Sequence, residues 1–286
     1  MERRVEIMKR VLLISCLGIL MTGQVITVKA SENVPADLAT QILEGEFSDE
    51  SKESVYKKVK ELLDLTKVAV QSNINIDGIF GVDELIDRFG DDYTYTDDMI
   101  SYDMWVVVNT FKLTAAINED NKVEYFYGYF YPTFETIEPS DSEEDLELVK
   151  DTLANLTSLP SFEALDAAYE DYDFSFIQDE MTYISGSQSY TYAWDSKELL
   201  KYEVGQANYG RANLTITQAD IDTLNEIEDL GIQRVIETVG ENWTYVYNIQ
   251  EDSQQFIWKD PLGKTISVDV TDELMVNKIE AKGLNE

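Results

Sequence analysis

One ten-residue pattern occurs twice in this chain of 286 residues, and it limits the folds that the chain can adopt. Residues 81–90 (GVDELIDRFG) align without gaps on residues 231–240 (GIQRVIETVG). Both read glycine, apolar, two polar, two apolar, two polar, apolar, glycine, which is one apolar stripe of a short amphipathic helix with a glycine at each end. Residues 161–170 (SFEALDAAYE) are a weaker copy with serine and glutamate in place of the glycines. We therefore expect three copies of one structural unit.

Another helix is predicted before each copy of the pattern. The apolar spacing predicts these helices over residues 55–72, 145–156 and 219–227. Ser140 and Glu143 have the spacing of a capping box before the second of them, and Thr217 is expected to cap the third. Each unit is thus expected to begin with a pair of helices.

β-Strand patterns follow each copy. The first strand-like run of each unit contains a tryptophan, namely Trp105, Trp194 or Trp258. These tryptophans recur with the repeated pattern, which favours core positions over binding positions for them. In the first and last units, two further strands joined by a polar turn come after the tryptophan.

Residues 124–132 (EYFYGYFYP) are the last expected strand of the first unit. Side chains alternate along a strand, so the phenylalanines are expected to face the helices and the tyrosines to face the open side of an antiparallel sheet. Tyrosines at period two recur in SYTYAW (residues 189–194). An alternative is that another unit covers these rings. The expected partner-binding residues are Tyr125, Tyr127, Tyr129, Tyr131, Tyr190 and Tyr192.

Two short helices, the second with glycines at its ends, followed by strands such as residues 256–284, resemble the superfamily of β-lactamase inhibitor protein and the outer-membrane assembly lipoprotein BamE (SmpA/OmlA). The resemblance is best in residues 219–284, weaker in 55–131 and poor in the middle copy. It implies an α+β fold of tandem repeats, each a helix pair packed on a four-stranded antiparallel sheet whose free face binds other proteins. The inhibitor has two such units, so three would be a departure, and none of its inhibitory residues can be placed here.

The first thirty residues have the features of a bacterial signal peptide. Basic residues precede an apolar run over residues 11–28, and small residues up to Ala30 fit cleavage before Ser31. We expect the chain to be secreted or associated with the cell surface. An uncleaved signal anchor is one alternative. A lipid anchor on Cys16 is another, although the apolar run continues beyond Cys16, where lipoproteins usually turn polar.

The expected domain organisation has five parts. They are a signal peptide (1–30), an acidic lead-in (31–53), repeat unit 1 (54–138), a divergent repeat unit 2 (139–216) and repeat unit 3 (217–286).

The chain is strongly acidic, with 56 acidic and 22 basic residues and a formal charge of −34 at pH 7. Such a charge repels nucleic acid and anionic envelope polymers and favours a protein partner with a basic patch. Solubility outside the cell is an alternative explanation of the charge. Beyond the signal peptide, no apolar run is long enough to span a membrane.

Several kinds of active site are excluded by residue type. The chain has no histidine, which removes Ser-His-Asp and Cys-His catalysis and most zinc sites. Cys16 is its one cysteine, so no intramolecular disulfide is expected. Gly263-Lys264-Thr265 resembles the end of a phosphate-binding loop but lacks the required glycine five residues earlier, and residues 260–263 are predicted to form a turn between strands.

Residues 73–84 have some features of a calcium-binding EF-hand loop. Asn73, Asn75, Asp77 and Glu84 fall at ligand positions. However, position one normally holds aspartate, and the repeat alignment pairs Glu84 with Arg234, a cation. An ordinary turn between helices is the favoured interpretation, and we expect no metal and no cofactor.

The sequence favours an exported, non-enzymatic protein-binding protein with acidic rims around aromatic sheet faces, either an inhibitor or an envelope scaffold. The alternative function is a carboxylate-dependent hydrolase of cell-wall or other glycans, which needs two facing carboxylates across a cleft. Acidic residues are too abundant here for spacing to select such a pair. A spacer protein without a ligand is a third possibility.

Overall fold

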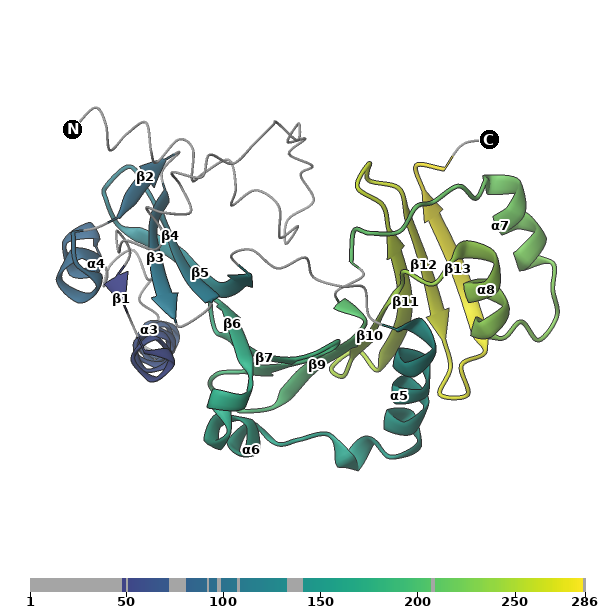
Figure 1. Ribbon diagram of the computed structural model, residues 1–286, viewed down its shortest axis with the longest axis horizontal. Helices are drawn as coiled ribbons and strands as arrows, with labels where there is room; N and C mark the ends of the chain where they lie inside the picture. Colours follow the sequence, from purple (N-terminus) through teal and green to yellow (C-terminus); the bar gives the residue numbers. More distant parts are fainter. Residues whose placement is uncertain are drawn as a thin grey trace. The chain divides into compact units, whose positions relative to one another are not determined.

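A computed structural model describes residues 48–49, 51–71, 81–91, 93–96, 99–106, 109–132, 141–206 and 209–284 (Figure 1). These residues fall into two compact units. Unit 1 holds the described residues up to 132 together with Phe174–Met181, and unit 2 holds residues 141–173 and 182–284. The division differs from the three units expected from the repeated pattern.

Unit 1 contains two described helices, α3 (Lys52–Gln71) and α4 (Val82–Phe89), beside a sheet. Its strands are β1 (Ser48–Asp49), β2 (Thr94–Thr96), β3 (Met99–Val106), β4 (Asn109–Ile117), β5 (Val123–Pro132) and, except for its first residue, β6 (Asp173–Ile177). Strands β3 to β6 pair antiparallel in chain order, β2 pairs antiparallel with β3, and β1 adds a short parallel pair to β3.

The core of unit 1 lies between α3 and one face of this sheet. Buried apolar side chains recur along α3 at Val55, Val59, Leu62 and Leu63, the spacing of one helix face. The ring of Tyr56 on α3 packs edge-on against Phe174 on β6 at 4.9 Å between centroids. Phe126 of β5 is 2% exposed, which confirms that the phenylalanines of this strand face the core.

Unit 2 contains the helices α5 (Ser142–Ala154), α6 (Phe162–Ala167), α7 (Gln218–Asn225) and α8 (Ile232–Val239), with 3-10 turns at Leu156–Ser158 and Tyr169–Asp171. Its strands are β8 (Gln188–Ala193), β9 (Leu199–Val204), β10 (Thr244–Asn248), β11 (Ser253–Lys259), β12 (Thr265–Val270) and β13 (Val276–Lys282). Strand β7 (Glu180–Ser185) begins in unit 1 and continues into unit 2. Strands β8 to β13 pair antiparallel in chain order.

The predicted fold class, separate four-stranded sheets each carrying a helix pair, is wrong. The strands form one hydrogen-bonded order, β1-β3-β4-β5-β6-β7-β8-β9-β10-β11-β12-β13, and the protein is mostly β. In unit 1, β5 pairs with β6, and in unit 2, β9 pairs with β10, although the prediction placed the members of each pair in different sheets. The physical reason is that an edge strand exposes unpaired N–H and C=O groups, which a neighbouring strand satisfies.

The helix caps agree in part with the sequence. The Thr217 hydroxyl accepts from the Asp220 N–H, and the Asp220 carboxylate accepts from the Thr217 N–H at 2.9 Å, which confirms Thr217 as the cap of α7. Hydrogen bonds from the Thr217 backbone and side chain lower the pKa of the Asp220 carboxyl. At α5 the cap is Asp141, whose carboxylate accepts from the N–H groups of Glu143 and Glu144, and the predicted cap Ser140 lies outside the described residues.

The two segments that define the repeated pattern have matching local geometry. Gly81 forms an isolated antiparallel bridge with Lys122, and Gly231 forms the same bridge with Met275. At the other end of each helix, Gly90 and Gly240 adopt φ of 90° and 122°, a region that favours glycine. The N–H of each of these two glycines donates to the carbonyl four residues earlier at 2.8 Å. The glycines at both ends of the pattern therefore have the same backbone role in α4 and α8.

Tyr102 in unit 1 makes the free energy of unfolding depend on pH in the alkaline range. Its ring is 3% exposed, and its hydroxyl has no hydrogen-bond partner within the part of the chain that the structure describes. Burial, with a smaller contribution from Tyr93, raises the pKa of Tyr102 from 10.0 to about 12. As pH rises, the Tyr102 hydroxyl loses its proton in the unfolded chain before it does so in the folded chain. The contribution of this group to the free energy of unfolding is therefore complete below pH 10 and is lost as pH rises toward 12.

We therefore expect the free energy of unfolding to fall between pH 10 and 12, and to fall less steeply in Tyr102→Phe. Urea denaturation of both proteins at pH 7, 10 and 11 measures this difference. Equal slopes in the two proteins would contradict the assignment. At pH 7 the substitution should cost little, because it removes a buried hydroxyl without a partner.

Candidate functional site

A row of tyrosines lies on β5 in unit 1. The rings of Tyr125 and Tyr127 are 6.3 Å apart with an interplanar angle of 21°, and those of Tyr127 and Tyr129 are 6.3 Å apart at 3°. All three side chains are half-buried. The side chain of the fourth predicted member, Tyr131, lies outside the described residues. The name tyrosine row is used below for Tyr125, Tyr127 and Tyr129.

The register of the sheet identifies the neighbours of the tyrosine row. Directly paired residues on antiparallel strands share a face. On β4, Lys112 pairs with Tyr129 and Thr114 pairs with Tyr127, and on β6, Ile177 pairs with Tyr127. On this face the row therefore lies between Lys112 and the buried Thr114 on one side and Ser175 and Ile177 on the other.

Acidic groups lie on the same sheet face and next to the row. Asp103 of β3 pairs with Lys112, so the two charges share the face of the tyrosines. Glu124 is exposed and directly precedes Tyr125, at the irregularity in the pairing of β4 with β5. The described part of this face thus carries charges of both signs rather than a uniformly acidic rim.

The opposite face of β5 is closely packed. Phe111 and Phe126 are buried, and Gly128 leaves room for the rings of Phe111 and Phe176, which a Cβ atom at position 128 would approach to within 3 Å. This packing positions the tyrosine row, because the two neighbours of Gly128 in the chain are Tyr127 and Tyr129. The core behind β5 limits how far the strand can shift.

Tyr190 and Tyr192 on β8 are interior residues of unit 2. Tyr192 is 1% exposed, packs edge-on against Phe162 and donates its hydroxyl to the Pro160 carbonyl. Tyr190 is 9% exposed and stacks on Tyr202 at 5.3 Å. These two tyrosines are not available on an exposed face for binding a partner.

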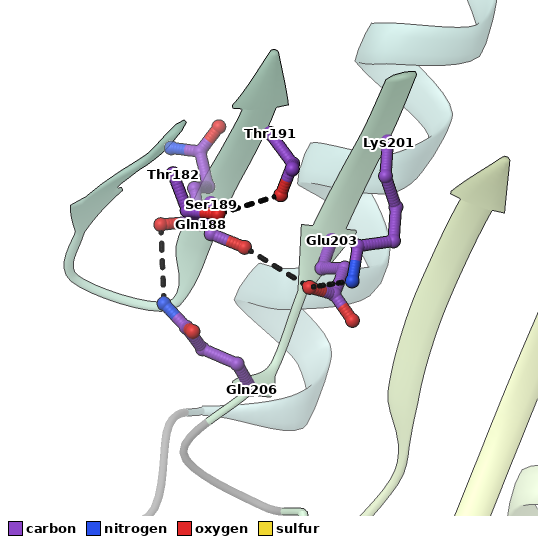
Figure 2. A network of polar contacts seen from close by, with 7 residues as sticks. All are labelled: Thr182, Gln188, Ser189, Thr191, Lys201, Glu203 and Gln206. Atoms are coloured by element: carbon purple, nitrogen blue, oxygen red, sulfur yellow. Dashed lines mark hydrogen bonds and ion pairs between the residues drawn. The ribbon is translucent and has the colours of Figure 1, made fainter. Parts of the chain in front are cut away.

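The face of β8 and β9 that lies opposite the rings of Tyr190 and Tyr192 carries a polar network (Figure 2). Ser189 donates to the Glu203 carboxylate at 3.3 Å, and the Lys201 ammonium pairs with the same oxygen at 3.2 Å. The hydroxyls of Thr182 and Thr191 lie 2.9 Å apart. These contacts join β7, β8 and β9 side by side, and the Gln206 side chain donates to the Gln188 backbone carbonyl at 3.2 Å.

This network is better suited to holding strands in register than to catalysis. Ser189 and Thr191 are 1% and 3% exposed, so their hydroxyls have little access to a substrate. The Ser189 hydroxyl donates to Glu203, whose charge is offset by Lys201. Cross-strand pairs of this kind stabilise a sheet by roughly 0.2–1 kcal/mol each.

The predicted calcium loop cannot be placed. Asn73, Asn75 and Asp77 lie outside the described residues, and the side chain of Glu84, at the start of α4, is also outside them. Among the residues that the structure describes, no group of three or more acidic, cysteine or histidine side chains is arranged to hold a metal ion. The predicted signal peptide and Cys16 also lie outside the described residues. No helix within the described ranges has the length and apolarity needed to cross a membrane.

Comparison of the chain with protein-family models, curated proteins and solved structures gives no match in any of the three.

Proposed function

We propose that this chain is an exported, non-enzymatic protein that binds a partner protein through the tyrosine row of unit 1. The single observation that supports this proposal most is the regular stack of Tyr125, Tyr127 and Tyr129, spaced at 6.3 Å on a sheet face away from α3. Tyrosine combines a large apolar ring with a polar tip and loses little conformational freedom on binding, which makes it frequent in recognition surfaces.

The chemistry of the partner follows from the charges. Lysine and arginine side chains bind the faces of tyrosine rings and pair with exposed carboxylates such as that of Glu124. A formal charge of −34 attracts a basic protein over the Debye length, about 8 Å at physiological salt. The expected partner is therefore an extracellular or envelope protein with a basic patch, and binding is expected to weaken as salt rises.

The test is capture of a partner from culture medium on the immobilised full chain at low and high salt. Tyr127→Ala combined with Tyr129→Ala is expected to weaken binding at least thirtyfold, because central tyrosines in interfaces contribute about 2 kcal/mol or more. Tyr95→Ala is the matched control, since Tyr95 is 54% exposed in unit 1 but pairs with the buried Ile100 rather than sharing the face of the row. Equal binding by the double variant and the control would refute the proposal.

A further inference from the structure

One end of unit 2 gathers four basic side chains in an acidic chain. Two carboxylates also lie at this end: Glu280, whose pKa is lowered mainly by its hydrogen bond with Lys278 and in part by Lys282, and Glu241, next to the Gly240 carbonyl that accepts from Trp258. Strands β11 and β12 meet there in a turn, β13 ends beside them, and the segment 209–217 runs past the end of β11 (Figure 1). Within residues 209–217, 259–265 and 281–284 the one acidic residue is Asp260. The basic residues of these three segments are Arg211, Lys259, Lys264 and Lys282.

The positions of these cations follow from the strand pairing and hydrogen bonds at this end of unit 2. Lys259 pairs with Thr265, and Thr265 pairs with Lys282, so Lys259 and Lys282 lie on the same face at the end of the sheet. The Ala212 N–H donates to the Lys259 carbonyl at 3.3 Å, which brings the neighbouring Arg211 to this end. The Lys264 ammonium donates to the Leu214 carbonyl at 3.0 Å.

The turn between β11 and β12 presents Leu262 to solvent. Leu262 is 81% exposed, a high value for a large apolar side chain. Asp260 is 5% exposed, and its carboxylate accepts from the N–H groups of Leu262 and Lys264 at 2.9 and 2.8 Å. The Gly263 N–H closes the turn onto the Asp260 carbonyl at 3.2 Å. The side chain of Leu262 is thus held out on a backbone that is already ordered, which lowers the entropy lost on binding.

A second exposed side chain, the aromatic Tyr209, lies beside these cations. Tyr209 is 42% exposed, and the Lys259 ammonium lies 4.9 Å from its ring centroid and 3.5 Å from its hydroxyl. The name basic tip is used below for Tyr209, Arg211, Lys259, Leu262, Lys264 and Lys282. It combines an apolar side chain on a turn, an amphipathic ring and four cations.

We propose that the basic tip binds the surface of an anionic lipid bilayer. Leucine inserted at the headgroup boundary, tyrosine at the interface and lysine or arginine against phosphates are the contacts that such a surface accepts. A leucine displayed on a turn needs a matching pocket in a protein partner, whereas a fluid bilayer needs none. The net charge of the chain predicts repulsion from anionic polymers, but charges more than about 8 Å away are largely screened at physiological salt, so the local sign governs contact.

The test places an environment-sensitive dye on the full chain at Leu262→Cys, in a Cys16→Ser background so that one thiol is present. Phosphatidylglycerol vesicles are expected to shift the dye emission to the blue, and spin-labelled lipid is expected to quench it at least twofold, whereas phosphatidylcholine vesicles should have little effect. The same dye at Glu251→Cys, in the exposed turn at the opposite end of β11, should not be quenched. No quenching at position 262, or equal quenching at both positions, would overturn the proposal.

Charge-reversal variants separate the effect of the basic tip on vesicle binding from the effect of the net charge of the chain. Lys259→Glu with Lys282→Glu is expected to raise the lipid concentration needed for half-maximal quenching at least tenfold. Lys150→Glu with Arg234→Glu makes the same change in net charge at exposed positions on α5 and α8 and should have a much smaller effect. An equal effect of the two pairs, or a response of the dye to soluble polyglutamate but not to vesicles, would overturn the assignment to lipid.

Discussion

Trp258→Ala is expected to lower the free energy of unfolding of unit 2 by about 3–5 kcal/mol, the usual cost of truncating a fully buried tryptophan. The ring of Trp258 is 0% exposed and packs near Phe256, at 6.4 Å between centroids. Its indole N–H donates to the Gly240 carbonyl at 2.7 Å, at the end of α8. The substitution therefore opens a large cavity and also releases the end of a helix from the sheet.

Urea denaturation followed by far-ultraviolet circular dichroism measures this loss without relying on tryptophan emission. Trp258→Phe is the matched variant, because it keeps most of the apolar burial but removes the indole N–H. It should cost about 1–2 kcal/mol, which is the loss expected for a buried hydrogen bond. A cost below about 1 kcal/mol for Trp258→Ala would mean that this ring is not part of the core.

Local elements could be predicted because each depends on a short stretch of sequence. The period of the apolar residues predicted α7 and α8, and the alternating runs predicted β5, β11, β12 and β13. Thr217 is confirmed as a cap, and residues 260–263 are confirmed as a turn. The tryptophans at positions 194 and 258 are buried, as their recurrence with the pattern predicted.

Pairing between strands distant in the sequence could not be predicted from these patterns. Backbone N–H and C=O groups make the pairs β5–β6 and β9–β10, and every residue except proline carries both groups. The side chains therefore hold little information on whether an edge strand ends a sheet or continues it. The resemblance to a superfamily with separate sheets supplied the wrong answer at this step.

The burial of Tyr190 and Tyr192 could have been predicted from the sequence. Ser189 and Thr191 alternate with these tyrosines, so one face of β8 carries small polar residues and the other carries aromatic rings. Burial of the aromatic face is then the expected outcome. On β5 both faces carry aromatic rings, so alternation alone left the tyrosine row available for binding.

The amino-acid composition of the chain gave no indication of the basic tip. A formal charge of −34 describes the whole chain, whereas the cations at this end come from three separate segments. Only the antiparallel pairing of β11, β12 and β13 brings Lys259 and Lys282 together. Net charge is therefore a poor guide to the sign of a particular surface.

Gly128→Val is expected to destabilise unit 1 by about 3 kcal/mol, at the upper end of the usual cost of overpacking a core. A Cβ atom at this position would lie 2.6 Å from a ring carbon of Phe176 and 2.7 Å from one of Phe111. Both rings are almost fully buried, with exposures of 3% and 0%, so neither can turn out of the way without disturbing the core. Denaturant unfolding, with hydrogen exchange of the amides of β4, β5 and β6 as a local readout, measures the loss.

Gly231→Ala is the control for Gly128→Val, because a Cβ atom at Gly231 meets no atom within 4 Å and its φ of −87° suits any residue. Its effect on stability should be within about 0.5 kcal/mol. The same core packing supports the tyrosine row, since Gly128 lies between Tyr127 and Tyr129. In those Gly128→Val molecules that remain folded, β5 must move away from the rings of Phe111 and Phe176. Partner binding should therefore weaken although no tyrosine has been changed. If the free energy of unfolding falls by the expected ~3 kcal/mol but the affinity for the partner is unchanged, the tyrosine row is not positioned by this core.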